Sequence, residues 1–128
     1  MTLLLDTHAL LWSAVAPEQL SAGAARAISE ADELAVAAMT WWELAWMVRR
    51  GRVTPRGSST SWFAALQRDV RTIPITPAIA LAAAALAAFP SDPGDRLIYA
   101  TAVDRGWRLV TKDGRMRAHD REGAVVVW

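Results

Sequence analysis

The 128-residue sequence contains no cysteine and only two histidines, His8 and His119. The absence of cysteine excludes disulfide frameworks, zinc–thiolate sites, iron–sulfur clusters and cysteine nucleophiles. Two histidines so far apart in the sequence argue against a histidine-rich metal centre. A metal site in this chain is therefore expected to use oxygen ligands.

Long apolar segments are also missing, because the stretch that ends at Phe89 is short and consists mostly of alanine. Such a stretch is not expected to span a bilayer, and the chain does not open with the basic and apolar regions of a signal peptide. We therefore expect a cytoplasmic protein without a membrane segment. Hydrophobic residues make up 53% of the chain and charged residues 21%, which predicts one folded domain over residues 1–128.

Short apolar segments alternate with longer segments of helical character. We predict strands over residues 2–6, 34–37, 72–74, 108–111 and 125–127. We predict helices over residues 10–12, 21–31, 40–50, 61–70, 77–88 and 95–105, and a turn over residues 112–114. The alternation is typical of a three-layer α/β/α fold whose central sheet of four or five short strands is mostly parallel.

Four acidic residues stand at the ends of predicted strands or in the first turns of predicted helices: Asp6, Glu43, Asp95 and Asp113. Because ligands bind at the carboxyl ends of parallel strands, we expect all four on one rim of the sheet. Each acid also has a local interpretation. Residues 40–43 fit a capping box, for example, and Asp113-Gly114 is a common turn dipeptide.

Taken together, the four acids predict a metal site. Asp6 directly follows three leucines, where an unpaired carboxylate is costly, and several carboxylates on one rim repel one another. A divalent cation removes this repulsion, and oxygen ligands suit Mg²⁺ or Mn²⁺ better than zinc. Such a site can activate water for phosphodiester hydrolysis, with either one ion or two.

The segments that contain these acids occur in the order typical of a known family. They are LLLDTHALLW at residues 3–12, TWWELA at 40–45, SDPGDRLIYATA at 91–102 and VTKD at 110–113. In these segments the sequence resembles the PIN-domain ribonucleases, especially the VapC-type toxins of bacterial toxin–antitoxin pairs. The resemblance extends over nearly the whole chain. Gly94 stands where members of the family often carry a bulkier residue, and this changes the expected wall of the pocket.

The resemblance implies an endoribonuclease that depends on Mg²⁺ or Mn²⁺ and leaves 5′-phosphate and 3′-hydroxyl ends on the RNA. It also implies a homodimer and an inhibitory antitoxin encoded alongside the enzyme. Carried over by position, the four acids are the catalytic residues, and Asp6, Asp95 and Asp113 are the metal ligands. Glu43 would orient the water or a ligand. Accessory roles are implied for Thr7, Thr111, Asp92 and Arg96.

Arginine and tryptophan residues allow more than one interpretation. Arg96 is expected to form an internal salt bridge or to contact phosphate. The arginines of residues 49–56 either favour the carboxyl end of a helix or contact an RNA backbone. Trp42 and Trp46 share one helix face, which belongs either to the core or to a surface covered by a second copy or an antitoxin segment.

Other functions fit the sequence less well. A receiver domain needs two adjacent acids after the first strand, and an Asp-x-Asp phosphatase needs an acid at position 8, where His8 stands. The remaining alternative is a catalytically silent PIN fold that binds RNA or protein. The four intact acids argue against that alternative.

Overall fold

Five short strands form one sheet in which every neighbouring pair is parallel. The computed structural model describes residues 1–128, and its strands are β1 (Thr2–Leu5), β2 (Glu33–Ala37), β3 (Arg71–Ile73), β4 (Arg108–Val110) and β5 (Val126–Val127). They lie in the order β3-β2-β1-β4-β5. The five predicted strands and the parallel central sheet are therefore confirmed.

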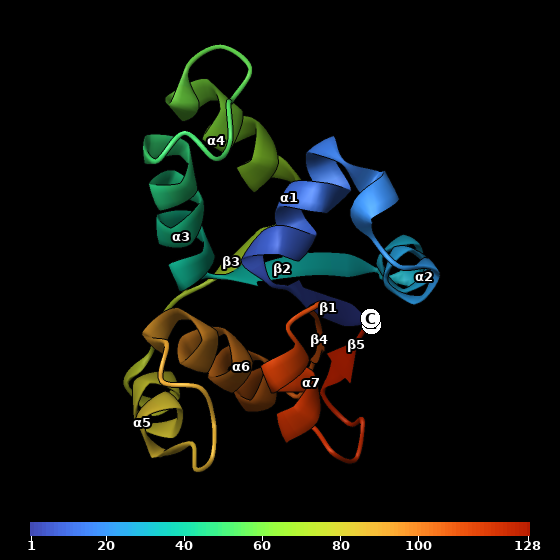
Figure 1. Cartoon of the computed structure of the whole chain (residues 1–128), viewed down its shortest axis with the longest axis vertical. Helices are drawn as coiled ribbons and strands as arrows, with labels where there is room; N and C mark the ends of the chain where they lie inside the picture. Colours follow the sequence, from blue (N-terminus) through green and yellow to red (C-terminus); the bar gives the residue numbers. More distant parts are fainter.

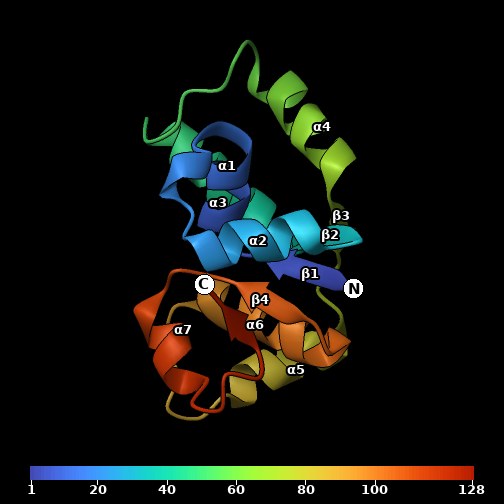
Figure 2. The same ribbon diagram turned by 90° about the vertical axis from the view of Figure 1, so that its right-hand side faces the viewer.

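Helices cover both faces of the sheet and complete the three layers (Figure 1). One face carries α1 (Thr7–Val15), the short 3₁₀ helix η1 (Pro17–Gln19), α2 (Ala22–Glu30), α3 (Ala38–Arg49) and α4 (Ser59–Asp69). The other face carries α5 (Pro77–Ala85), α6 (Pro93–Arg105) and α7 (Gly114–His119), as the turned view of Figure 2 also shows. None of these helices combines the length and hydropathy that crossing a membrane requires.

The leucines of β1 divide the core into two clusters. Leu4 packs with residues of α5 and α6, whereas Leu3 and Leu5 pack with residues of α1, α2 and α3. Because both faces of the strand are covered, all three leucines are fully buried. Within the sheet, β2 pairs with one edge of β1 and β4 pairs with the other edge. The strand order therefore changes direction between β1 and β4. The carboxyl ends of β1 and β4 therefore meet where such sheets bind ligands.

Helix α3 starts earlier than the sequence pattern predicts. It begins at Ala38 after the cap residue Ala37, whose side chain makes no capping bond, and Thr40 is buried inside its first turn. The capping-box interpretation of residues 40–43 is therefore wrong. Glu43 lies in the second turn, where its carboxylate is not needed by the start of the helix.

Aspartates cap three other helices, of which two begin before the predicted residue and the third was not predicted. Asp6 accepts a hydrogen bond from the backbone N–H of Ala9 and caps α1, which begins at Thr7, as the local interpretation of Asp6 as a helix cap predicts; the predicted helix at residues 10–12 lies inside it. Asp92 caps α6, which begins at Pro93. The predicted turn at residues 112–114 is the start of α7, a helix of six residues capped by Asp113.

Candidate functional site

A cleft of about 890 Å³ opens beside the carboxyl ends of β1 and β4. It is lined by every acid that the sequence analysis singled out for catalysis, and by one accessory acid: Asp6, Glu43, Asp95, Asp113 and Asp92. These residues come from four separate segments of the chain. The expectation that the acids share one rim of the sheet agrees with this arrangement.

Asp6 lies at the bottom of the cleft, where β1 ends and α1 begins. Its side chain is buried, with 8% of the residue exposed, and accepts a bond of 2.7 Å from the backbone N–H of Ala9. Burial raises the pKa of Asp6, while the fully buried Thr111 hydroxyl lowers it by bonding to the charged form. This carboxyl group is therefore held in place but poorly solvated.

Glu43 projects into the cleft from α3 and is held by α1. The Thr7 hydroxyl donates a hydrogen bond of 2.6 Å to Glu43 Oε1. Burial raises the pKa of Glu43, and the Thr7 bond opposes that effect. Gly94 lets the carboxylate lie against the start of α6, because a Cβ atom at that position would stand only 2.5 Å from Glu43 Oε2.

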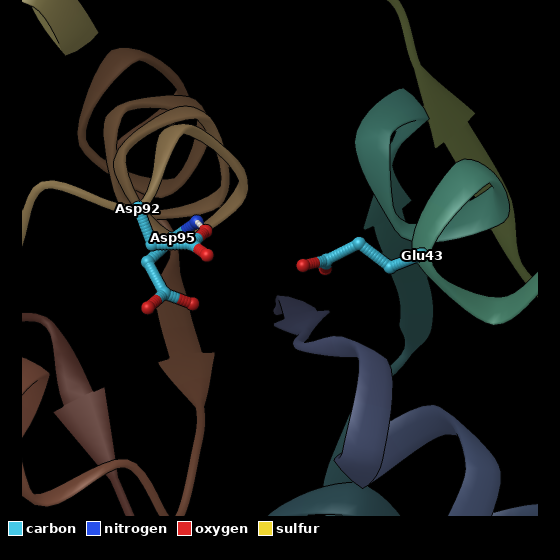
Figure 3. A group of neighbouring side chains, drawn as sticks. All are labelled: Glu43, Asp92 and Asp95. Carbon is cyan, nitrogen blue, oxygen red and sulfur yellow. Dashed lines mark hydrogen bonds between the residues drawn. The ribbon is translucent and has the colours of Figure 1, made fainter. Parts of the chain in front are cut away.

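Asp92, the cap residue of α6, and Asp95, in its first turn, face Glu43 (Figure 3). One carboxylate oxygen from each of the three residues lies within 4.8 Å of the other two. Asp92 is exposed and accepts a bond of 3.0 Å from the Asp95 N–H. Burial, together with the charges of Asp92, Asp113 and Glu43, raises the pKa of Asp95 to about 7.

The chemistry of these groups fits a hard divalent cation. The donors are carboxylate oxygens. Burial is the largest cause of the raised pKa of Asp95, and the charges of the neighbouring acids add to it; a bound cation would offset those charges. The closest group consists of Glu43, Asp92 and Asp95, whereas Asp6 and Asp113 lie in the same cleft outside it. The sequence indicates only an accessory role for Asp92 and does not predict this grouping.

Arg115 is a cleft residue that the sequence analysis missed. Its Nη2 atom lies 3.4 Å from Asp95 Oδ2 and 3.6 Å from Asp113 Oδ2. Asp113 in turn accepts bonds from the backbone N–H groups of Arg115 and Met116 at the start of α7. Recognising residues 114–119 as a helix would have placed Arg115 next to the acids.

Arg96 does not line the cleft, and the expectation of an internal salt bridge for it is wrong, while the phosphate contact stays a prediction. Its guanidinium group instead donates to five backbone carbonyls at the end of α5 and in the loop that follows, those of Ala83, Ala84, Leu86, Phe89 and Pro90. The planar fork of donors suits this role. Arg96 thereby anchors the segment that leads to Asp92 and Asp95.

Comparison with known proteins agrees with the fold and with the motif segments. The family model described as PIN domain matches residues 3–122. Ribonuclease VapC22 of Mycobacterium tuberculosis is 51% identical over 128 residues, which cover 99% of this chain and 98% of that protein.

Solved structures from toxin–antitoxin systems share the fold. A toxin–antitoxin complex from Klebsiella pneumoniae has a TM-score of 0.69 at 22% identity, covering 97% of this chain and 95% of that chain. VapBC2 from Rickettsia felis, bound to a DNA fragment from their promoter, has a TM-score of 0.69 at 12% identity, covering 98% of this chain and 97% of that chain. Because the family model matches residues 3–122, almost the whole length of this chain, the chain belongs to the PIN domain family.

Proposed function

We propose that this protein is a metal-dependent endoribonuclease and the toxin of a toxin–antitoxin pair. The convergence of five carboxylates in one cleft carries the proposal. The 51% identity to Ribonuclease VapC22, over nearly all of both chains, supports the ribonuclease activity. Residues 1–128 act in this proposal as one domain, of which the PIN match covers residues 3–122.

The proposed metal ligands are Asp6, Asp95 and Asp113, to which the structure adds Asp92 as a candidate. When bound, Mg²⁺ or Mn²⁺ supplies a water activated for in-line attack on a phosphodiester and neutralises charge on the departing 3′ oxygen. That attack leaves a 5′-phosphate and a 3′-hydroxyl.

The residues around the metal site position the reacting groups. The Thr7 hydroxyl holds the Glu43 carboxylate, which then orients the attacking water. Burial and the neighbouring acids raise the pKa of Asp95 to about 7, so a divalent cation that binds near neutral pH would displace a proton from this carboxyl group. Arg115, Arg52 and Lys112 bring positive charge to the cleft, where they attract the phosphate backbone of RNA.

The proposal includes an antitoxin partner and a homodimer. The solved complexes that share this fold come from toxin–antitoxin systems, and this supports a protein that binds the chain and blocks the cleft. The homodimer is carried over from the family resemblance. A cytoplasmic location follows from the proposed action on cellular RNA.

The acids provide the most direct test of the activity. Asp6→Asn and Asp95→Asn, made separately, are expected to abolish Mg²⁺- or Mn²⁺-dependent cleavage of RNA without unfolding the protein, because asparagine keeps the shape and removes the charge. Asp104→Asn is a matched control, since Asp104 is exposed on α6 outside the cleft. Undiminished cleavage by both cleft variants would contradict the assigned site.

Expression in cells tests the toxin role. Induction of the wild-type protein is expected to arrest growth, and the product of the neighbouring gene is expected to relieve the arrest. Mapping the RNA ends after brief induction should show 5′-phosphates. Growth without arrest at confirmed expression would favour the catalytically silent binding module instead.

A further inference from the structure

Two tryptophans on α3 are exposed although they are large and apolar. Trp42 is 61% exposed and Trp46 is 42% exposed, and their rings stack at 5.8 Å between centroids with an angle of 11°. Trp41, next to them in the sequence, instead packs against Phe63 and donates its indole N–H to the Thr72 hydroxyl. The core therefore accounts for Trp41 but not for the stacked pair.

A cationic side chain, that of Arg50, lies against the stacked tryptophans. The Arg50 guanidinium lies 4.7 Å from the centre of the Trp46 ring. Trp42, Trp46 and Arg50 are spaced four residues apart along α3, so the Trp46 ring lies between the other two groups. Arg50 covers one face of the Trp46 ring, and Trp42 stacks on Trp46. The outer face of the Trp42 ring is left for another flat group.

Trp42 forms a wall of two adjoining hollows that share two acids. It lines the acidic cleft together with Trp46, Glu43 and Asp92. It also lines a mostly apolar hollow of about 490 Å³ between the starts of α3 and α6, where Ile75, Pro93 and Gly94 complete the apolar wall and Glu43 and Asp92 face in. A flat apolar group bound there would lie directly beside the acids.

The surrounding charges complement a polyanion that carries flat rings. Arg52 and Lys112 line the acidic cleft, and Lys112 Nζ lies 5.6 Å from the ring centre of Trp12, which lines the same cleft. Aromatic faces next to cations are what single-stranded nucleic acids use, since bases stack on the rings and phosphates meet the positive groups. A base that is paired in a duplex does not expose a face for such stacking.

We propose that the hollow between α3 and α6 receives an unpaired nucleobase next to the cleaved phosphate, stacked on the outer face of Trp42. This inference rests on the proposed function and adds to it a subsite that binds a base of the RNA. Trp46 and Arg50 support the stack from behind. Gly94 keeps the hollow continuous with the acids, because a side chain there would meet Glu43.

Equilibrium binding of RNA tests the stacking separately from cleavage. The protein carries Asp95→Asn to prevent hydrolysis, and Mn²⁺ is present. The probes are a labelled single strand of about ten nucleotides, the same strand with abasic sugars in its central part, and a duplex of the same sequence. Trp42→Ala is compared with Trp42→Phe, which keeps an aromatic face, and with Leu81→Ala, which removes an exposed apolar side chain on α5 outside both hollows.

Trp42→Ala is expected to weaken binding of the intact single strand by roughly 5- to 100-fold, the range for one stacked base. Trp42→Phe should stay within about threefold of the parent protein, and Leu81→Ala should not change the affinity. The loss caused by Trp42→Ala should disappear with the abasic strand, because that strand keeps the phosphates and lacks the stacking partner.

Three results would overturn the proposal: an unchanged affinity of Trp42→Ala for the intact strand, an equal loss with the abasic strand, or dissociation of a dimer at unchanged RNA affinity. The last result would assign the tryptophans to a contact between two copies. Failure of the proposed function looks different, because the wild-type protein would then not cleave RNA in Mn²⁺. If the wild-type protein cleaves RNA but Trp42→Ala does not change the affinity for the single strand, only the base site is refuted.

Discussion

The Thr7 hydroxyl and the Glu43 carboxylate are joined by a hydrogen bond of 2.6 Å that links α1 to α3 across the cleft. Thr7, which positions Glu43, directly follows Asp6 in the chain. The bond favours the charged form of Glu43 and counteracts the effect of burial on its pKa. The two helices and two of the acids are therefore coupled through one side chain.

Replacing Thr7 by valine tests this coupling. Valine keeps the volume and removes the donor, so Thr7→Val is expected to lower the cleavage rate about tenfold, as is usual for residues that orient a metal site. The free energy of unfolding should fall by about 1–2 kcal/mol at alkaline pH, where Glu43 is charged. Thr7→Ser, which keeps the hydroxyl, is the control, and an equal loss in both variants would assign the effect to packing.

Gly94 offers a substitution that should separate activity from stability. A Cβ atom there would meet the end of the Glu43 side chain, which can move aside at little cost. Gly94→Ala is therefore expected to displace the carboxylate and to reduce cleavage about tenfold. Its free energy of unfolding should fall by no more than the roughly 1–2 kcal/mol that the Thr7–Glu43 bond contributes.

Gly114→Ala is the matched control for Gly94→Ala. Gly114 also lies in the first turn of a helix, and a Cβ atom on it meets nothing within 4 Å. Its activity should match that of the wild type. If both alanine variants keep full activity, Glu43 does not need its observed position.

The raised pKa values predict how stability depends on pH when no metal is bound. Asp95 has an ordinary pKa of 3.8 and a pKa of about 7 in the fold, so the folded protein binds more protons than the unfolded chain between these values. The free energy of unfolding should therefore fall as the pH rises through this window and level off above about pH 7. Asp6 and Glu43, whose pKa values are also raised, contribute with the same sign.

Urea unfolding in the presence of a chelator measures this effect. The contribution of Asp95 should be on the order of 2–4 kcal/mol between about pH 5 and pH 8. Asp95→Asn should flatten the profile, and Mn²⁺ should restore the stability of the wild type at the higher pH. Stability that rises across this range in chelator would show that the acids do not repel one another as described.

Arg96 is expected to be essential for the fold, because its guanidinium group binds five backbone carbonyls. Lysine keeps the charge but not the planar fork, so Arg96→Lys should lower the free energy of unfolding by about 2–3 kcal/mol. Thermal or urea unfolding provides the measurement. Arg26→Lys, at an exposed position on α2, should be neutral, and equal stability of both variants would contradict the anchoring role.

The strands and the acidic cleft were predictable because their signals are local. A run of buried leucines such as residues 3–5 indicates a parallel strand, and an acid at its end indicates the rim of the sheet. Where helices begin was less predictable. The cap of α3 is an alanine, and the aspartates 92 and 113 that cap α6 and α7 also look like turn residues.

Residues whose partners lie on other elements could not be placed from the sequence. Arg96 lies next to Asp95 in the chain, which suggested a carboxylate partner, but its side chain turns to the end of α5. Arg115 reaches Asp95 only because α7 packs beside α6. The hydrophobic pattern of α3 likewise did not show which tryptophans are exposed.

Calorimetric titration with Mn²⁺ near neutral pH, repeated in buffers of different ionisation enthalpy, tests the central claim most directly. The carboxylates of the cleft should bind the ion and release protons on binding, because Asp95 is partly protonated at that pH. The Asp95→Asn variant should lose most of the affinity and of the proton release. If the wild-type protein takes up no Mn²⁺ even with RNA present, or if Asp95→Asn binds it equally well, the cleft is not a metal centre.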